Sequence, residues 1–356
     1  MIGYHCPETI RQESDIEDDS TSFSPDMTHQ IFGDQESIFG YRDLSIQIYY
    51  TAAKLIPYIN MTYTDKVTPE KCDGLQADSV LETINKEMPP GVITNIDQFL
   101  SMLSKDADFK PYGKMLHSYK VIKNNEERHF VIYKTDIECA GFREYHERLQ
   151  TFILYFIDAA SYIDVDDERW QFYLFQMLVL PPFQRQGHGA QLIQTFYNDC
   201  YNRADILDIT VEDPSENCQR VRDFVDVKNC MMLPSFQKDK LLEGFSEDMV
   251  KEAREKLKIT KKQARRIYEI LRLKVTDTSN PQQYRDYRLL IKKRLNAPFQ
   301  KNGRDFQKLQ QALRPDEFTA AMSSVSTEQR LQYLEKAFQE HVDMYRHIIE
   351  RVAAMV

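Results

Sequence analysis

Apolar and polar residues follow regular spacings over the first 160 positions of the chain. Residues 44–50 are apolar at every second position, which is the pattern of a half-buried strand, and residues 129–134 predict another strand. Residues 93–103 predict a short helix, and residues 142–160 place apolar side chains at the spacing of a buried helix face. This part of the chain therefore predicts a mixture of strands and helices.

Two β-like runs come next, and a helical segment separates them. The runs cover residues 170–180 and 206–211, and the helical segment extends from residue 188 to about residue 203. The order strand, helix, strand is that of a βαβ unit, in which the two strands are parallel. We therefore expect residues 170–180 and 206–211 to be parallel strands of one sheet.

Beyond Pro234 the pattern becomes helical. Residues 246–274, 282–295, 304–313 and 326–354 have helical periodicity and are rich in Lys, Arg, Glu, Leu and Ala. Prolines mark the turns between these segments. The last third of the chain therefore predicts a helical C-terminal domain.

Composition excludes several classes of protein. Of the 356 residues, 42% are hydrophobic and 12% aromatic, which suffices for a sizeable core and excludes a wholly disordered chain. The longest apolar stretch, residues 151–162, is shorter than the roughly 20 residues of a membrane-spanning helix. No secretory signal is visible, and the six cysteines are scattered without metal-ligand spacing. We expect reduced thiols, no metal site and no membrane partner.

Charge is unevenly distributed. Residues 1–250 contain 23 Lys and Arg against 42 Asp and Glu, whereas residues 251–310 contain 18 against 6. An acidic body raises the local concentration of a basic partner. The basic tract at residues 251–310 is either a solvated helix face or a surface that touches phosphates. The sequence leaves both interpretations open.

A loop between residues 177 and 190 carries the clearest chemical signal. An apolar run ends in Pro181 and Pro182, and a short loop with Gly187 and Gly189 opens directly into the helical segment. Loop glycines let several backbone N–H groups point at one anion, and the N-terminus of a helix adds its own unpaired N–H groups. The spacing fits neither a dinucleotide-binding fingerprint nor a Walker A loop. It predicts a diphosphate site, with a tight strand–helix turn as the alternative.

The residues Gln184, Gly187 and Gly189 fit the pattern Gln/Arg-x-x-Gly-x-Gly/Ala, which resembles the acetyl-coenzyme-A loop of the GNAT acetyltransferase superfamily. Several longer segments resemble histone acetyltransferase type B catalytic subunits. These segments are residues 141–150, 162–170, 180–192, 208–215 and 265–273. The resemblance extends from about residue 28 to the C-terminus.

This resemblance implies an α+β fold, with a GNAT-like mixed sheet, flanking helices and a helical C-terminal domain. Four regions are expected: a loose leader (residues 1–27), an N-terminal α/β domain that contacts the histone tail (28–135), a shortened GNAT acetyltransferase domain (136–233) and the helical domain (234–356).

The resemblance also implies which residues contact acetyl-CoA as co-substrate. The backbone of residues 177–179 would pair with the pantetheine arm, and the loop would hold the diphosphate. The expected cofactor-binding residues are Met177, Leu178, Val179, Gln184, Arg185, Gln186, Gly187, His188, Gly189, Ala190 and Phe224. For Phe224, core packing is an equally good interpretation, and the two roles are compatible.

Acetyl transfer to lysine needs a base, because a lysine ammonium with a pKa near 10.4 is neutral in only about one molecule in a thousand at neutral pH. Glu212 ends the second predicted strand, at the same sheet edge as the loop, and by resemblance matches the general base of the family. Asp213 is either an auxiliary base or the N-cap of a following helix. Asp34 and Glu36 match a segment that holds the histone tail, with exposed surface acids as the alternative.

The chain also departs from the family. Immediately after Leu174 it lacks a segment that, in the family, completes one strand, forms a hairpin partner and supplies a further acidic candidate for catalysis. The strand that feeds the loop thereby loses a neighbour, and its backbone groups must pair elsewhere. This departure suggests a splice form or truncated gene product with impaired activity.

The resemblance implies a histone acetyltransferase of type B that acetylates lysines in the tails of newly made, free histone H4. The expected partners are histone H4 together with H3 and a WD-repeat histone-binding chaperone subunit, in nucleus and cytoplasm. One alternative is a catalytically impaired form that acts as a histone- or chaperone-binding module. Another, less favoured, is a nucleic-acid binder that uses residues 251–310.

Overall fold

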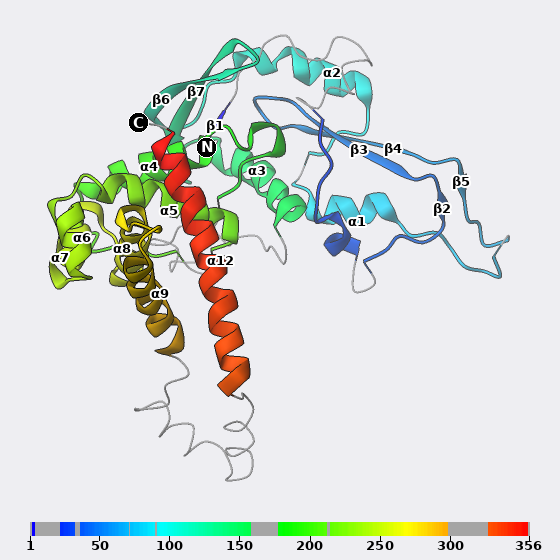
Figure 1. Cartoon of the computed structure of the whole chain (residues 1–356). Helices are drawn as coiled ribbons and strands as arrows, with labels where there is room; N and C mark the ends of the chain where they lie inside the picture. The colour runs from blue at the N-terminus through cyan, green and yellow to red at the C-terminus, as the bar shows by residue number, and fades with distance from the viewer. Residues whose placement is uncertain are drawn as a thin grey trace, which may run out of the picture. The chain divides into compact units, whose positions relative to one another are not determined.

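A computed structural model describes residues 2–3, 22–32, 36–70, 72–89, 91–157, 177–211, 214–297 and 327–354. The chain forms two compact units, residues 1–195 and 196–356 (Figure 1). The division falls inside helix α4 (His188–Tyr201), so the expected domain boundaries after residues 135 and 233 remain predictions.

The described strands of the first unit form three small antiparallel sheets. Their order is β1-β7-β6 in one sheet, β2-β5 in the second and β3-β4 in the third. The strands are β1 (Ile2–Gly3), β2 (Tyr41–Arg42), β3 (Ser45–Tyr50), β4 (Pro57–Thr62), β5 (Asp65–Lys66), β6 (Lys114–Lys123) and β7 (Glu126–Lys134). The strands predicted at residues 44–50 and 129–134 are confirmed as β3 and the second half of β7. Asn124 and Asn125, both at positive φ, form the two-residue turn between β6 and β7.

The helices of the first unit are α1 (Val80–Glu87), α2 (Ile96–Ser104), α3 (Phe142–Phe156) and the first half of α4. The helix predicted at residues 93–103 is confirmed as α2. It begins at Ile96 because the Asn95 side chain accepts the Gln98 N–H at 3.0 Å, which caps the helix. The helix predicted at residues 142–160 is confirmed up to Phe156, and residues 158–160 lie outside the described part.

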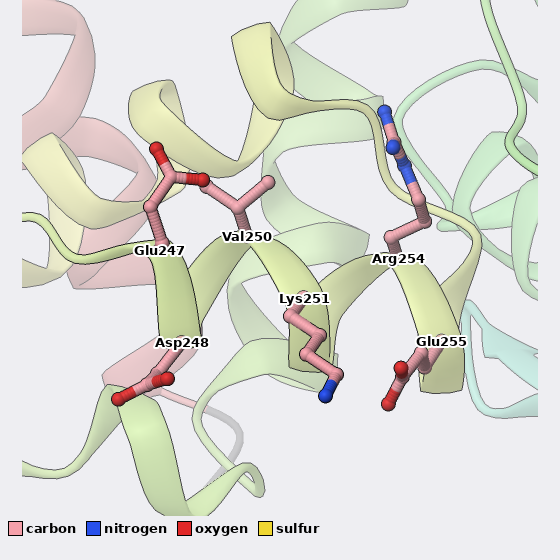
Figure 2. A pocket seen from close by; sticks show the side chains of 6 residues that line it. All are labelled: Glu247, Asp248, Val250, Lys251, Arg254 and Glu255. Carbon is pink, nitrogen blue, oxygen red and sulfur yellow. The ribbon is translucent and has the colours of Figure 1, made fainter.

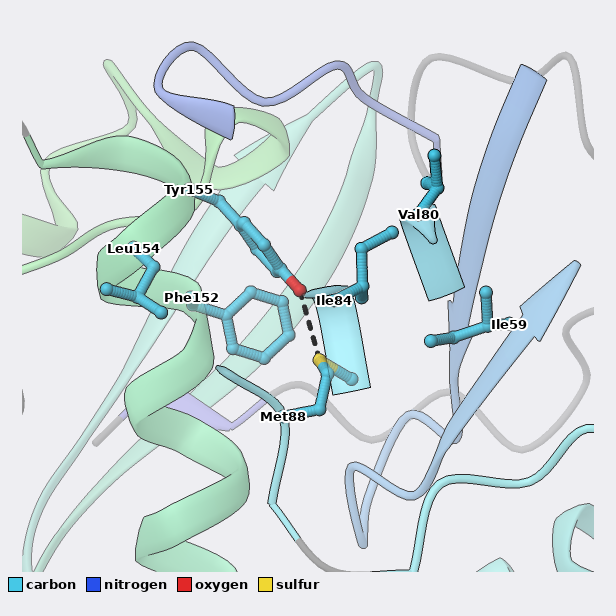
Figure 3. Packing of buried hydrophobic residues seen from close by; sticks show 7 residues of the cluster. All are labelled: Ile59, Val80, Ile84, Met88, Phe152, Leu154 and Tyr155. Carbon is cyan, nitrogen blue, oxygen red and sulfur yellow. Dashed lines mark hydrogen bonds between the residues drawn. The ribbon is translucent and has the colours of Figure 1, made fainter. Parts of the chain in front are cut away.

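One face of α3 packs into an apolar cluster with α1 and β4. Its buried members are Ile59, Val80, Ile84, Met88, Phe152, Leu154 and Tyr155 (Figure 3). The hydroxyl of Tyr155 donates to the Met88 sulfur at 3.1 Å, so the polar end of this buried ring is satisfied. This cluster is the base against which the loop segment described below packs.

The second unit is helical. Its helices are the second half of α4, α5 (Glu216–Cys230), α6 (Lys238–Glu243), α7 (Glu247–Leu257), α8 (Lys261–Val275), α9 (Pro281–Asn296) and α12 (Thr327–Ala353). The helices predicted at residues 282–295 and 326–354 are confirmed as α9 and α12. The segment predicted at 304–313 lies outside the described residues.

The single helix predicted at residues 246–274 is two helices in the structure. Lys258 adopts a left-handed conformation with φ of 56°, which ends α7. The side chain of Thr260 then accepts the Gln263 N–H at 3.3 Å and caps the start of α8. A lysine in the left-handed region carries no obvious sequence signal, which is why the break was missed.

Ion pairs join the helices of the second unit across its interior. Glu269 of α8 is fully buried and accepts two hydrogen bonds from Arg294 of α9, at 2.7 and 2.9 Å. The same carboxylate accepts a bond of 3.1 Å from the Tyr345 hydroxyl of α12. Asp223 of α5, also fully buried, pairs with Arg266 of α8 at 2.6 Å. The basic tract is therefore partly an internal element of the bundle.

The predicted parallel pairing of residues 170–180 with residues 206–211 needs correction. Residues 177–180 form no strand, and in residues 206–211 only Ile209 bridges another residue, Ile259, in an isolated parallel bridge. Residues 170–176 lie outside the described part of the chain. The helix between the two runs is confirmed as α4, and the α+β class with a helical C-terminal region is confirmed as well.

Candidate functional site

Residues 177–180 are half-buried and lead into the loop. Leu178 and Leu180 pack against the apolar cluster of α1, α3 and β4, so alternate side chains anchor the segment without a sheet ladder. A short 3-10 turn, Pro181–Phe183, follows. Two consecutive prolines restrict φ at this turn. The Phe183 N–H donates to the Leu180 carbonyl at 2.9 Å, and the Gln184 N–H donates to the Pro181 carbonyl at 3.1 Å.

Side-chain donors tie the loop to its own backbone. The Gln184 side-chain amide donates to the Val179 carbonyl at 2.9 Å, and that of Gln186 donates to the Pro182 carbonyl at 2.7 Å. The ammonium of Lys123, at the end of β6, also donates to the Pro182 carbonyl, at 3.4 Å. These bonds give the two glutamines a structural role in shaping the loop and bring one cationic side chain beside it.

The bend before α4 leaves room for a ligand. Gly187 has φ of 89°, which glycine adopts without strain, and a Cβ added there would meet no atom within 4 Å. Helix α4 begins at His188, and the Gln191 N–H donates to the Gly187 carbonyl at 3.1 Å. Among the described residues, no group accepts from the N–H groups of residues 188–190. Unpaired donors at a helix N-terminus are suited to an anion, so the loop remains a candidate diphosphate site.

The side chain of His188, at the start of α4, is buried against the β6–β7 hairpin. It is 1% exposed, its ring lies 4.3 Å from that of Phe130, and its Nδ1 is 2.7 Å from the Tyr119 hydroxyl. Burial lowers the pKa of His188, and burial raises the pKa of Tyr119 to about 12. Both side chains are therefore neutral near pH 7, and Tyr119 can donate to Nδ1. His188 therefore adds no positive charge to the loop.

Sequence reasoning missed Tyr119 and Lys123. Both belong to β6, where polar and apolar residues alternate, but nothing in their spacing connects them to a loop some 60 residues away. Their relation to the loop arises only when the β6–β7 hairpin packs against the start of α4. All the loop residues named from the sequence, from Met177 to Ala190, lie in this one segment of the first unit.

The segment that leads to Glu212 belongs to the second unit. Its central residue, Ile209, donates its N–H to the Lys258 carbonyl at 2.7 Å and accepts at its carbonyl from Arg222 at 2.9 Å. Asp208 pairs with Arg254 at 3.4 Å. Glu212 and Asp213 themselves lie outside the described residues.

The N-cap interpretation of Asp213 is wrong. Helix α5 begins at Glu216, and the Ser215 side chain accepts the Cys218 N–H at 3.3 Å, so Ser215 is the N-cap. Ser215, two positions after Asp213, is also a residue type that caps helices, and its hydrogen bond identifies it as the cap. Asp213 therefore precedes the cap.

The remaining predicted site residues have different surroundings. Phe224 of α5 is 4% exposed, and the Arg351 guanidinium lies 4.9 Å from the centre of its ring, so it has the packing role that the sequence allowed. Glu36 is exposed and has φ of 49°. Asp34 lies outside the described residues.

A surface pocket lies on α7, in the second unit. Its lining residues are Glu247, Asp248, Val250, Lys251, Arg254 and Glu255, which project from successive turns of that helix (Figure 2). Within the described ranges, no group of three or more His, Cys, Asp or Glu side chains is placed to hold a metal ion. None of the helices described is both long and apolar enough to cross a membrane.

Three family models match the chain. Residues 7–158 match the N-terminus of histone acetyl transferase HAT1, residues 97–221 match the acetyltransferase (GNAT) family, and residues 222–273 match the C-terminal region of the histone acetyltransferase type B catalytic subunit. The first match begins well before residue 28, where the resemblance seen in the sequence began.

Individual relatives agree with these matches. The histone acetyltransferase type B catalytic subunit of Homo sapiens is 46% identical over 381 aligned residues, which cover 97% of this chain and 91% of the human protein. The subunit of Mus musculus is 45% identical over the same shares. A protein of the same description from Dictyostelium discoideum is 31% identical over 80% of this chain and 70% of its own length. The human alignment is longer than the 356 residues of this chain, so the human protein contains residues without a counterpart here.

Proposed function

The chain belongs to the family of histone acetyltransferase type B catalytic subunits, and from that premise we propose that it transfers the acetyl group of acetyl-CoA to lysine side chains in the tail of free histone H4. The observation that carries this proposal is the loop before α4, where the N–H groups of residues 188–190 have no acceptor among the described residues and a Cβ added at Gly187 would meet no described atom within 4 Å. An acyltransferase of this family needs such a site for its co-substrate.

The loop fits the diphosphate of the co-substrate. When bound, acetyl-CoA supplies an activated acetyl thioester. The N–H groups of residues 188–190 would hold the diphosphate, and the backbone of residues 177–179 would lie along the pantetheine arm. Neutral His188 adds no charge but supports the first turn of the helix. Arg185, exposed and in a left-handed conformation, is placed in the same loop.

Glu212 is our candidate for the general base. A carboxylate at this position would take a proton from the lysine ammonium, so that the neutral amine can attack the thioester carbon. The support is its place directly after the segment that Arg222 and Lys258 hold by hydrogen bonds. Asp213 is an auxiliary candidate, and the finding that Ser215 caps α5 leaves its carboxylate without the capping role.

The acidic surface is suited to a basic substrate. Glu36 is exposed in the first unit, and with Asp34 it would pair with lysine and arginine side chains of the tail. We further propose histone H3 as the companion of H4, a WD-repeat histone-binding chaperone as partner subunit, and action in nucleus and cytoplasm. The relatives are named histone acetyltransferase type B catalytic subunits, and these names support a histone substrate and a further subunit.

A second function is a catalytically impaired form that binds histones or their chaperones without turnover. Two observations favour it. The human relative contains residues that this chain lacks, and in the described residues neither residues 177–180 nor residues 206–211 belong to a sheet. The missing residues after Leu174 would explain both.

Mass spectrometry of an H4 tail peptide after incubation with acetyl-CoA tests the first function. We expect acetylated lysine with the natural chain and a rate lower by about 10²- to 10⁴-fold with Glu212→Gln. The control is Glu216→Gln, an exposed carboxylate on the first turn of α5 that pairs with Arg220. Equal rates for Glu212→Gln and the natural chain would refute the role of this base.

Calorimetric titration of acetyl-CoA into the natural chain separates the two functions. Binding of acetyl-CoA together with acetyl transfer to H4 supports the enzyme. Binding of H4 without any acetyl transfer supports the impaired form. Loss of acetyl-CoA binding on Gly187→Val would confirm that the loop is the site in either case, because valine is strained at a φ of 89°.

A further inference from the structure

Aromatic rings are exposed on a small lobe of the first unit, which we define as residues 36–43 and 63–78; the structure describes all of it except residue 71. Strands β2 and β5 pair within this lobe (Figure 1). Phe39 is 47% exposed and Tyr63 is 46% exposed. Single exposed apolar side chains are common on protein surfaces, so the chemistry around these rings decides their role.

The lobe holds its rings on a fixed backbone. The Phe39 N–H donates to the Asp78 carboxylate at 2.6 Å, and the Phe39 carbonyl accepts from the Asp78 N–H at 3.1 Å. The Tyr41 hydroxyl donates to the Asp78 carbonyl at 2.8 Å. Gly40 has φ of 94°, and a Cβ added there would meet that of Ala77 at 2.5 Å, so the two segments are in close contact. A preorganised surface of this kind loses little conformational freedom when a ligand binds.

One cation of the lobe lies on an aromatic ring. The Lys66 ammonium is 5.2 Å from the centre of the Tyr41 ring. The Tyr63 ring meets the Tyr41 ring edge-on, with 5.2 Å between their centres. In the described part of the chain, no lysine or arginine lies over the ring of Tyr63 or Phe39. These two rings therefore present negative faces that no cation of the described residues occupies.

The charge of the lobe is complementary to a basic partner. The lobe contains six Asp and Glu against three Lys and Arg, and all six acids are exposed. The six acids are Glu36, Asp43, Asp65, Glu70, Asp73 and Asp78. A surface with this balance attracts cationic peptides and repels nucleic acids. The rings and the carboxylates are therefore suited to the same ligand, a peptide rich in lysine or arginine.

We propose that the lobe is a docking surface for a lysine- or arginine-rich peptide, whose cationic side chains lie over the rings of Tyr63 and Phe39 while the carboxylates attract it. This inference rests on the proposed function, since the basic tail of the substrate is the peptide that the lobe would hold. It assigns no chemical step to the lobe, and it adds aromatic side chains to the carboxylates proposed for the tail.

Fluorescence anisotropy of a labelled H4 tail peptide, titrated with the full chain without acetyl-CoA, tests the proposal. We expect Tyr63→Leu and Phe39→Leu each to lower the affinity about 2- to 5-fold, as loss of one surface cation–π contact does, and the double variant to lower it further. Tyr63→Phe keeps the ring and should retain the natural affinity. Tyr333→Leu, which removes a half-exposed ring of α12, is the control and should also retain it. A natural affinity in the double variant would overturn the proposal.

A peptide with glutamine in place of every lysine and arginine separates cation binding from apolar contact. We expect the natural chain and the double variant to bind this neutral peptide equally weakly. Binding of the neutral peptide as tight as that of the H4 tail would overturn the proposal, because the rings would then act as an apolar surface. Sedimentation analysis tests a second copy of the chain as the occupant. A dimer that forms with the natural chain and is lost in the double variant would also overturn the proposal.

Acetylation of the same H4 peptide keeps this inference distinct from the proposed function. Peptide binding that the double variant weakens, without acetylation by the natural chain, would support the docking surface and refute acetyl transfer. Acetylation with the same KM for the peptide in the natural chain and the double variant would support transfer and overturn the docking surface. If circular dichroism shows that the double variant does not fold, the single variants Tyr63→Leu and Phe39→Leu decide by the same measurements.

Discussion

The two units of the molecule hold their functional segments by different means. In the first, residues 177–180 are anchored by Leu178 and Leu180 against an apolar cluster. In the loop that follows, the helix-terminal N–H groups have no acceptor among the described residues. In the second, residues 206–211 are held by a buried arginine and a backbone carbonyl. A segment anchored by apolar side chains keeps its backbone N–H and C=O groups available for a ligand. A segment anchored by hydrogen bonds uses these groups to fix its own position.

The interiors of the two units differ in the same way. The cluster of the first unit is apolar, and the hydroxyl of Tyr155 bonds to the sulfur of Met88 within it (Figure 3). The second unit buries charged side chains in its helix contacts: Arg222, Asp223, Asp226 and Glu269. We therefore expect the second unit to respond more strongly to the loss of one charge and to pH. The four predictions below test this difference in order of decreasing effect.

Replacing Glu269 by alanine should have the largest effect. The substitution leaves Arg294 and the Tyr345 hydroxyl without their buried acceptor, and removing one partner of a buried pair lowers the free energy of unfolding by about 3–5 kcal/mol. Denaturant unfolding measures the change. Glu335→Ala, which removes an exposed partner of Arg288 and Lys292, is the control and should change it by less than about 1 kcal/mol. Equal losses would contradict the distinction.

Replacing Asp226 by asparagine should change the pH dependence of stability. Burial raises the pKa of Asp226 from 3.8 to about 6, although Arg222 acts against this shift. The folded protein then binds this proton more tightly than the unfolded chain, so the free energy of unfolding falls as pH rises from 3.8 to about 6. Asparagine does not titrate, so the free energy of unfolding of the variant does not fall for this reason. Relative to the natural chain, it should gain about 2–3 kcal/mol between these pH values.

Urea unfolding of both proteins at pH 4.5 and pH 7.5 measures this gain. Asp248→Asn, on the exposed surface of α7, serves as the control and should show the pH dependence of the natural chain. A constant difference between Asp226→Asn and the natural chain at all pH values would show that Asp226 does not titrate in this window.

Replacing Gly187 by alanine should weaken acetyl-CoA binding. At a φ of 89° a side chain costs about 1–3 kcal/mol, and relief of this strain would turn the N–H groups of the loop away from the ligand. Calorimetry should show affinity lower by about 10- to 100-fold. Gly74→Ala is a matched control, with φ of 84° and equally open surroundings, and should leave the affinity unchanged.

Replacing Tyr119 by phenylalanine should have the smallest effect. The variant keeps the ring but removes the bond to His188, which contributes about 0.5–1.5 kcal/mol to the stability of the first unit. Thermal unfolding should show a small decrease, and acetyl-CoA affinity should fall by less than in Gly187→Ala. Tyr63→Phe, half exposed and away from the loop, controls for the loss of a hydroxyl. An affinity loss larger than that of Gly187→Ala would show that side-chain support outweighs backbone conformation.

Local features were predictable from the sequence, and features that depend on distant partners were not. The loop and the start of α4 follow from nearby prolines and glycines, whose backbone restrictions act within a few residues. The pairing of residues 170–180 with 206–211 depends on neighbours along a ladder, and the chain lacks residues that its human relative contains. The N-cap of α5 was assigned to Asp213, but Ser215, a residue of equal capping tendency two positions later, caps the helix.

The structural role of the basic tract, residues 251–310, also depends on distant partners and could not be predicted from the sequence. Its sequence fits a solvated face or a phosphate-binding surface, but Arg266 pairs with the buried Asp223, and Arg294 pairs with the buried Glu269. These acids are 25 to 43 positions away from their partners, a relation that composition does not reveal. The pairs give the tract a structural role in the helix bundle, which weakens the nucleic-acid alternative.

The donors offered at the loop belong to peptide groups, and no lysine occurs between residues 177 and 190. A protein that handles reactive thioesters exposes its own amines to stray modification, and a modified lysine loses its charge. Peptide nitrogens do not undergo this reaction under physiological conditions. If the loop binds acetyl-CoA as we propose, its peptide donors cannot be acetylated by the compound that they hold.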